Sequence, residues 1–181
     1  MNIQPTALSG VLHIIPKKFS DPRGSFWETY NERILCEAGL PEDWKQDNTS
    51  VSLKNVVRGI HYQITQPQGK LVRVTYGAVY DVAVDLRRSS PTFGKHVGFE
   101  LSEDNGAMLW IPPGFGHAFA ALSERAGFAY KVTDYYSSSG ERTILWNDPD
   151  LAIAWPVTGK DAIVSAKDQQ GSRFREAEVF A

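Results

Sequence analysis

The chain has 181 residues, the usual length of one domain, and its formal net charge of -2 comes without any basic stripe. Nucleic acid is therefore not expected as a partner, and no apolar run is long enough to span a membrane. The N-terminus lacks the basic and apolar segments of a signal peptide, and the lone Cys36 excludes an intrachain disulfide or a cysteine zinc site. We expect a cytoplasmic protein.

The N-terminal part of the chain predicts short strands and one helix. Strand patterns cover residues 8–15 and 25–30, with a turn signal at Asp21-Pro22-Arg23-Gly24 between them. Asn31 is suited to cap a helix over Glu32–Ala38, which a glycine and a proline would end.

The stretch that organises the rest of the sequence is Arg58-Gly59-Ile60-His61-Tyr62-Gln63, followed after a short loop by Lys70. Strand patterns flank the loop, so we expect a hairpin that carries His61 and Lys70 on adjacent strands. Strict alternation places Arg58 and His61 on opposite faces. Both can line one cavity only if the strand bulges, and Gly59 is the natural place.

Two neighbouring segments also bear on this region. Residues 46–52 are polar and β-branched, which fits either a strand lining a wet cavity or an exposed edge strand. Residues 78–86 form a run of strand formers in which Asp81 and Asp85 share one face. Asp85 has arginines nearby as partners at the strand end, whereas Asp81 is expected to face the cavity.

The strand count predicts the fold class. About nine or ten short strands alternate with turn residues, and the segment after Trp146 is mostly irregular. We therefore expect an all-β, double-sheet jelly roll of the cupin type, with one or a few short helices. A single domain would span residues 1–181, and the last residues, about 169–181, would form a short helix or a loose tail.

The residue types in the central stretch favour acid–base chemistry next to a carbonyl group. His61 is suited to remove a proton, and Lys70 to stabilise the negative oxygen that results. A tyrosine would return the proton, and a carboxylate near His61 would fix its tautomer. The simpler alternative is that His61 is only a packed or surface residue.

A catalytic metal is the competing hypothesis. Many jelly-roll enzymes hold a divalent ion through two histidines one residue apart, but here the matching place reads His61-Tyr62-Gln63. The other histidines are scattered singly, so spacing gives no support to a metal site and we expect none. The phosphate-loop and nucleophile-elbow motifs are also absent.

Many motifs, in order from about residue 8 to residue 168, resemble the dTDP-4-dehydrorhamnose 3,5-epimerase family. They are Asp21-Pro22-Arg23-Gly24-Ser25-Phe26-Trp27-Glu28, Gln46-Asp47-Asn48-Thr49-Ser50, Arg58-Gly59-Ile60-His61-Tyr62-Gln63, Gln68-Gly69-Lys70-Leu71-Val72, Asp81-Val82-Ala83-Val84-Asp85-Leu86-Arg87, Pro113-Gly114-Phe115-Gly116-His117, Tyr130 with Tyr136, Trp146-Asn147-Asp148-Pro149 and Ser165-Ala166-Lys167-Asp168.

The resemblance implies a cupin jelly roll that forms homodimers and uses no metal or organic cofactor. The implied substrate is dTDP-4-dehydro-6-deoxy-D-glucose, whose C3 and C5 are inverted on the way to dTDP-L-rhamnose.

The resemblance also implies roles for individual residues. His61 is similar to the family's base, Asp168 to its orienting partner, Tyr130 to the acid, and Lys70 to the group that stabilises the enolate. The remaining matches are binding positions, with Tyr136 stacking on thymine and the early strands able to reach a partner's site: Arg23, Phe26, Glu28, Gln46, Asp47, Asn48, Arg58, His117, Tyr136, Glu141 and Lys167.

Three alternatives and one departure stay open. The chain could be a relative that inverts only C3 or only C5, a silent jelly roll that binds a nucleotide sugar, or a metal-dependent cupin enzyme. The loop between His61 and Lys70 is about one residue shorter than is usual in the family, which could shift Lys70.

Overall fold

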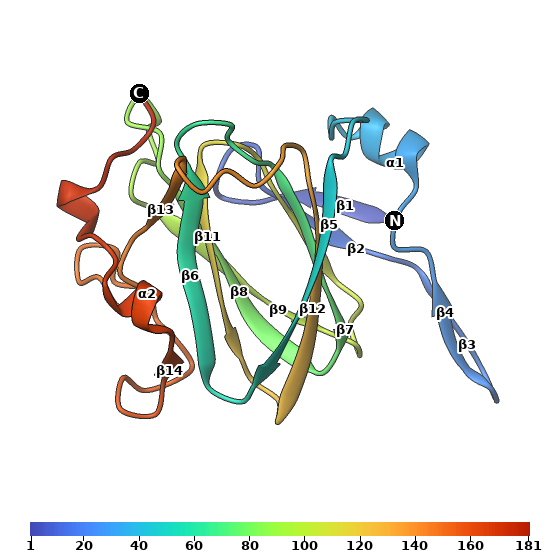
Figure 1. Cartoon of the computed structure of the whole chain (residues 1–181). Coiled ribbons are helices and arrows are strands. Elements are labelled where there is room, and N and C mark those ends of the chain that lie inside the picture. Colours follow the sequence, from blue (N-terminus) through green and yellow to red (C-terminus); the bar gives the residue numbers. More distant parts are fainter.

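Two facing β-sheets make up the body of the computed structural model, which describes residues 1–181 (Figure 1). One sheet has the strand order β1-β2-β10-β7-β12-β5, and the other has β13-β6-β11-β8-β9, with β14 alongside β6. The strands are β1 (Asn2–Pro5), β2 (Leu12–Ile15), β3 (Lys18–Asp21), β4 (Gly24–Trp27), β5 (Gln46–Leu53), β6 (Val56–Gln63), β7 (Lys70–Tyr76), β8 (Ala78–Asp85), β9 (His96–Ser102), β10 (Met108–Ile111), β11 (Phe115–Ala121), β12 (Arg125–Val132), β13 (Glu141–Thr143) and β14 (Ile163–Val164).

The main core lies between the two sheets. Val72 and Phe128 reach it from one sheet, and Val79, Ala83 and Phe119 reach it from the other. These residues alternate along each strand with residues of the opposite face. In the second sheet that face is buried too, because Val82, Val84 and Ala118 pack against the C-terminal part of the chain. The all-β, double-sheet jelly roll predicted from the sequence is therefore confirmed.

The strand count was predicted too low, since the chain has 14 strands. The missed strands are short or lack a strand pattern. For example, β1 contains Pro5, and β11 is buried throughout, so it shows no polar alternation. The helix prediction is confirmed: α1 covers Glu32–Glu37, and the Asn31 side chain caps it by accepting a hydrogen bond from the Ile34 amide.

The predicted hairpin between His61 and Lys70 is wrong. Strand β6 pairs with β11, β13 and β14, whereas β7 pairs with β10 and β12 of the opposite sheet. The loop between them crosses from one sheet to the other. At its end, the amide of Gly69 donates a hydrogen bond to the Thr133 hydroxyl at 2.8 Å. His61 and Lys70 therefore approach each other across the interior rather than along one sheet.

The C-terminal segment packs against the second sheet. A short helix, α2 (Ala166–Gln169), is capped by Ser165 and lies beside β6. The 3-10 helix Phe174–Glu176 follows, and the carbonyl of Phe180 accepts a hydrogen bond from the Arg88 amide at 2.9 Å. In the segment predicted to form a short helix or a loose tail, about 169–181, the 3-10 helix is the only helical part after α2, and the remainder is irregular.

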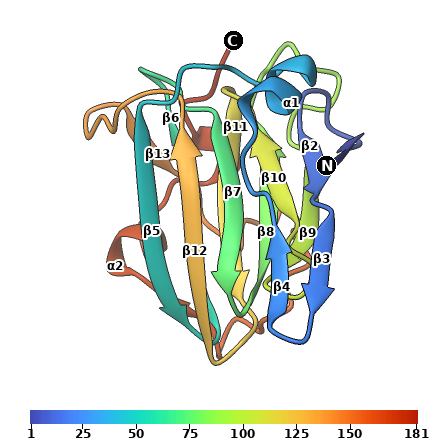
Figure 2. The ribbon, with the colours of Figure 1, turned by 90° about the vertical axis from the view of Figure 1, so that its right-hand side faces the viewer.

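The hairpin of β3 and β4 stands apart from the two sheets. In Figure 1 it extends to the lower right, away from β6 and α2. Figure 2, viewed from the right-hand side of Figure 1, shows its two strands face-on. The side chain of Phe26 on this hairpin is 71% exposed. No helix of the chain is both long enough and apolar enough to cross a membrane.

Candidate active site

A cavity between the two sheets brings together the residues that the sequence singles out. Its volume is about 210 Å³, and side chains of both sheets line it. The lining residues are Ser50, Arg58, His61, Lys70, His117, Phe119, Phe128 and Tyr130.

A bulge in β6 places Arg58 and His61 on the same side, as the sequence predicts. His117 of β11 pairs with His61, and Phe119 pairs with Arg58, so β6 carries one extra residue between these pairs. Gly59 lies there with φ +114, and a Cβ atom on it would lie 2.5 Å from the Cβ of Ala118. Only glycine fits this position, and the bulge is what brings both side chains to the cavity.

His61 forms a hydrogen-bonded pair with Asp168 of α2. The distance from His61 Nε2 to Asp168 Oδ1 is 2.6 Å, and Asp168 is buried. Burial alone would raise the pKa of Asp168, but hydrogen bonds from His61 and from the Gly59 amide outweigh it and lower the pKa. The carboxylate therefore stays charged and accepts a hydrogen bond from His61 Nε2–H, which leaves the lone pair of His61 Nδ1 free to take a proton.

Lys70 lies at the start of β7 in the same cavity, so the shorter loop does not remove it from the site. Burial lowers the pKa of Lys70 to about 8, although the charges of Asp81 and Glu141 act in the opposite direction. The ammonium group is therefore the main form at neutral pH, and it is less strongly solvated than a surface lysine. Such a group can stabilise a negative oxygen that forms during a reaction.

Tyr130 of β12 completes the group of reactive side chains. It lies beside Phe128, with 6.0 Å between the ring centroids. Burial raises the pKa of Tyr130, an effect that the charge of Arg58 partly offsets. The phenol is therefore protonated at neutral pH and can act as a proton donor.

A second histidine–aspartate pair lies deeper between the sheets. His117 Nε2 is 2.8 Å from Asp81 Oδ2, and both residues are buried. The ring of His117 stacks on Phe128, with centroids 5.7 Å apart. Asp81 was expected to face the cavity, but it is not a lining residue and is joined to the cavity by its hydrogen bond to His117.

A polar cluster outside the cavity contains four more of the predicted binding residues. The hydroxyl of Tyr136 donates to Glu141 at 2.7 Å, and Lys167 forms an ion pair with the same carboxylate. The Gln46 side chain accepts a hydrogen bond from the Tyr136 amide at 3.3 Å. Glu141 is opposite Gln63 on the strand that carries His61, so this cluster adjoins the cavity.

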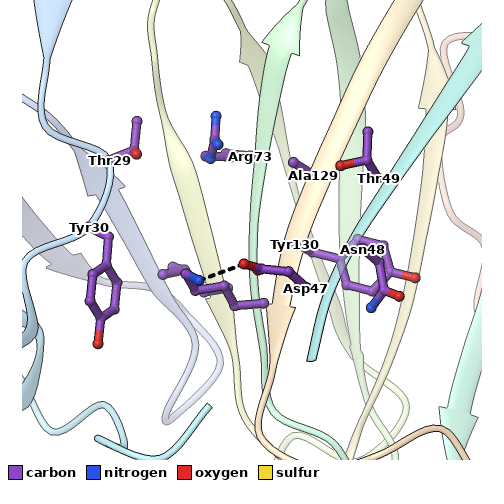
Figure 3. A pocket seen from close by; sticks show the side chains of 10 residues that line it. Thr29, Tyr30, Asp47, Asn48, Thr49, Arg73, Ala129 and Tyr130 are labelled. Atoms are coloured by element: carbon purple, nitrogen blue, oxygen red, sulfur yellow. Dashed lines mark hydrogen bonds and ion pairs between the residues drawn. The ribbon is translucent and has the colours of Figure 1, made fainter. Parts of the chain in front are cut away.

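Asp47 and Asn48 do not lie in the cavity but line a shallow pocket beside β5 and β12, which Figure 3 shows. Asp47 forms an ion pair there with Lys131 at 2.8 Å, and its side chain is 68% exposed. Asn48 alternates with Asp47 along β5, so it shares a strand face with the cavity residue Ser50. Its side chain accepts a hydrogen bond from Gln46.

The three predicted binding residues from the early strands lie outside the cavity. Arg23 bonds to Asp21, with its side chain 90% exposed, and Phe26 projects from the same hairpin. Glu28 accepts a hydrogen bond from Asn31 just before α1. Within one chain, none of them joins His61.

Ser50, Phe119 and Phe128 line the cavity but were not among the predicted site residues. Ser50 could have been found from alternation, because it lies on the same face of β5 as Gln46 and Asn48. Phe119 gave no signal, because its strand was not predicted.

The arrangement defines a class of protein. A jelly roll that holds a histidine–aspartate pair, a buried lysine and a protonated tyrosine around one cavity is suited to enzymes that remove and return protons beside a carbonyl group. No group of three or more histidine, cysteine or acidic side chains lies close enough together to hold a metal ion.

Comparison with known proteins identifies the family. Residues 5–176 match the family described as dTDP-4-dehydrorhamnose 3,5-epimerase. The chain is 53% identical over 176 residues to the dTDP-4-dehydrorhamnose 3,5-epimerase of Pseudomonas aeruginosa, covering 96% of each chain. It also superimposes on the crystal structure of the dTDP-6-deoxy-D-glucose-3,5-epimerase of Legionella pneumophila in complex with dTDP-4-keto-L-rhamnose. That TM-score is 0.94 at 46% identity, covering 98% of this chain and 94% of the other.

A further relative has a narrower name. The dTDP-4-dehydrorhamnose 3-epimerase of Streptomyces niveus is 39% identical over 179 residues, covering 98% of this chain and 86% of the relative. The chain belongs to the dTDP-4-dehydrorhamnose 3,5-epimerase family, and it is a cupin-fold epimerase.

Proposed function

We propose that this chain converts dTDP-4-dehydro-6-deoxy-D-glucose to dTDP-4-dehydro-L-rhamnose by inverting C3 and C5 in the pathway to dTDP-L-rhamnose. The observation that carries the proposal is the hydrogen-bonded pair of His61 and Asp168 at 2.6 Å, in a cavity that also contains Lys70 and Tyr130. A base, an oxygen-stabilising cation and an acid are the three groups that such an inversion requires.

The proposed reaction begins when His61 Nδ1 removes the proton from C3 or C5, both of which neighbour the C4 ketone. The electron pair of the broken C–H bond forms a C=C bond, and the C4 carbonyl becomes an enolate that the Lys70 ammonium stabilises. Asp168 stabilises the imidazolium through its hydrogen bond. The phenol of Tyr130 then donates a proton to the opposite face of the same carbon, which restores the ketone with inverted configuration.

The proposed binding residues have charges suited to a nucleotide sugar. Arg58 lies in the cavity, where its Nε donates to the Ser52 hydroxyl at 3.0 Å, and its remaining donors suit a diphosphate. Tyr136 is 57% exposed beside Glu141 and Lys167, so its ring is accessible for stacking on thymine. Gln46, Asp47, Asn48 and His117 remain proposed binding positions, and no cofactor is expected.

We also propose a homodimer in which the β3–β4 hairpin of one chain completes the partner's site. Arg23 and Phe26 are exposed and lie apart from the cavity of their own chain, which supports this arrangement. Light scattering should give a mass of two chains. We further propose that residues 1–181 act as one domain in the cytoplasm, where a lone cysteine would remain reduced.

Solvent exchange tests the function. Purified protein would be incubated with the ketosugar in heavy water, with chelator present, while NMR follows C3 and C5. Deuterium incorporation with inversion at both carbons is expected. The absence of exchange at either carbon, with dTDP still bound, would contradict the proposal and leave a binding protein or another substrate.

Inversion of one carbon alone is the second candidate function. The Streptomyces niveus relative, named a 3-epimerase, covers 98% of this chain, so the whole fold is compatible with that narrower activity. The same NMR experiment separates the candidates, since a C3 epimerase would leave the configuration at C5 unchanged.

A further inference from the structure

Asp81 is a buried carboxylate that the reaction described above does not use. Its side chain is 0% exposed, and only one of its two oxygens has a hydrogen-bond partner, the ring of His117. Oδ1 has no partner at all, which is rare for a buried carboxylate. Burying a charge in this way is costly unless a neighbouring charge compensates.

Asp85, four residues further along β8, shows what an ordinary structural carboxylate looks like in this protein. It is also 0% exposed, but Arg87 binds it at 2.8 Å, and the hydroxyls of Ser90 and Thr92 donate to it. The negative charge of Asp85 is thus balanced by the residues that bind it, whereas that of Asp81 is not.

Lys70 lines the same cavity as His117, the hydrogen-bond partner of Asp81. Lys70 is not within ion-pair distance of Asp81, but it is near enough for the Asp81 charge to raise the pKa of Lys70 against the effect of burial. Other titratable groups around the cavity come from β6, β11, β12, β13 and α2. They are Arg58, His61, His117, Tyr130, Glu141, Lys167 and Asp168.

Two acids, Asp81 and Glu141, act on Lys70, and Asp81 is the one that no cation engages. Glu141 also acts on Lys70, but it is bound by Lys167 and Tyr136. Burial lowers the pKa of His117 despite the opposing influence of Asp81, so this ring is neutral at neutral pH and does not neutralise the carboxylate.

We infer that Asp81 is a positioning residue for the epimerase reaction: its hydrogen bond holds His117 in the Nε2–H tautomer, and its uncompensated negative charge stabilises the Lys70 side chain in the same cavity. The Nδ1 atom of His117 is then an acceptor available to a substrate hydroxyl. The inference rests on the proposed function for its kinetic consequence, whereas the tautomer of His117 can be measured without substrate.

Asp81→Asn is the direct test, because the amide oxygen preserves the hydrogen bond to His117 while the charge is lost. The rate constant kcat/KM would be measured from pH 6 to 10. In the wild type, the rate should fall above about pH 8, where Lys70 loses its proton. In Asp81→Asn this fall should occur about one pH unit lower, because an opposite charge has been removed from the lysine.

Asp85→Asn is the matched control, since it also removes a buried carboxylate from the same face of β8. It should lower the melting temperature but leave the alkaline fall of kcat/KM where it is. If Asp81→Asn reduces activity by the same factor at every pH, as a structural defect would, the inference is overturned.

Histidine-selective ¹⁵N NMR of the wild type gives a second, independent measurement should Asp81→Asn not fold. The chain has 4 histidines, so the His117 signals can be assigned with one variant, His117→Gln. Signals of an unprotonated Nδ1 and a protonated Nε2 across pH 6–8 are expected. The opposite tautomer would overturn the inference even if the protein proves to be an active epimerase. Correct NMR signals without exchange of the ketosugar would instead count against the proposed function alone.

Discussion

Two histidine–aspartate pairs of similar length face one cavity, but their surroundings differ. The His61–Asp168 distance is 2.6 Å and the His117–Asp81 distance is 2.8 Å. The side chain of His61 is 31% exposed, whereas that of His117 is 10% exposed and packed against Phe128. Asp168 also accepts a hydrogen bond from the Gly59 amide, whereas the second oxygen of Asp81 has no hydrogen-bond partner.

The difference is the reason to propose His61, and not His117, as the general base, although each histidine is hydrogen-bonded to an aspartate. A base must reach the substrate and must gain a proton without leaving the pair unbalanced. His61 satisfies both conditions, because its ring is accessible and Asp168 is well bound on both oxygens. Burial disfavours protonation of the His117 ring and outweighs the opposing charge of Asp81, and the charge of Lys70 adds to the effect of burial.

Replacing each histidine in turn should distinguish the two pairs most clearly. His61→Ala should reduce kcat by about 10⁴-fold, the upper end of what a general base contributes, while dTDP binding measured by calorimetry stays nearly unchanged. His117→Ala should reduce kcat/KM by only about tenfold, the loss of one good hydrogen bond.

His96→Ala is the control for both variants, because His96 lies on β9 and does not line the cavity. It should retain full activity. Turnover by His61→Ala above about 1% of the wild-type rate would contradict the assignment of His61 as the base. A loss of activity in His117→Ala greater than that in His61→Ala would assign the base to His117 instead.

The charge of Asp168 should matter less than the base itself. Asp168→Asn preserves the size of the side chain but cannot stabilise the imidazolium as a carboxylate does, so kcat should fall by about 10²-fold. Stopped-flow or NMR rates would measure it. Loss of only twofold would mean that Asp168 acts mainly by tying α2 to β6 through the Gly59 amide and not in the proton transfer.

The sequence allowed much of this cavity to be predicted, because short motifs carry their own geometry. His61, Lys70, Arg58, His117 and Tyr130 meet as the resemblance implied, and the bulge at Gly59 followed from alternation alone. Their roles in the reaction remain predictions that the variants above test.

Other features depend on contacts that a sequence does not display. The loop after Gln63 has turn residues that fit a hairpin equally well, and only pairing with β11 and β12 decides that it crosses between sheets. The lack of a hydrogen-bond partner for Asp81 Oδ1 could not be predicted from the sequence either, since it depends on how the two sheets pack.

The bulge in β6 links the two pairs, so its loss should disturb both. Gly59→Ala would place a Cβ atom 2.5 Å from the carbonyl oxygen of His117, in a backbone conformation with φ +114. We expect the free energy of unfolding to fall by about 3 kcal/mol, measured by urea denaturation. Gly159→Ala is the control, because nothing lies within 4 Å of the added atom. Equal stability of the two variants would mean that β6 tolerates another path.

The smallest effect on catalysis is expected from Ser52→Ala, a variant that alters neither histidine–aspartate pair and so serves as a reference for both. Ser52→Ala removes the hydroxyl that accepts the Arg58 Nε hydrogen bond at 3.0 Å, which frees the guanidinium to adopt other positions. If Arg58 binds the diphosphate, this loss of preorganisation should raise KM by about fivefold, equivalent to about 1 kcal/mol, with kcat unchanged. Steady-state kinetics at one pH suffice. A fall in kcat comparable to that of Asp168→Asn would show that the His61–Asp168 pair responds to any disturbance of the cavity, and the distinction between the two pairs would then lose its basis.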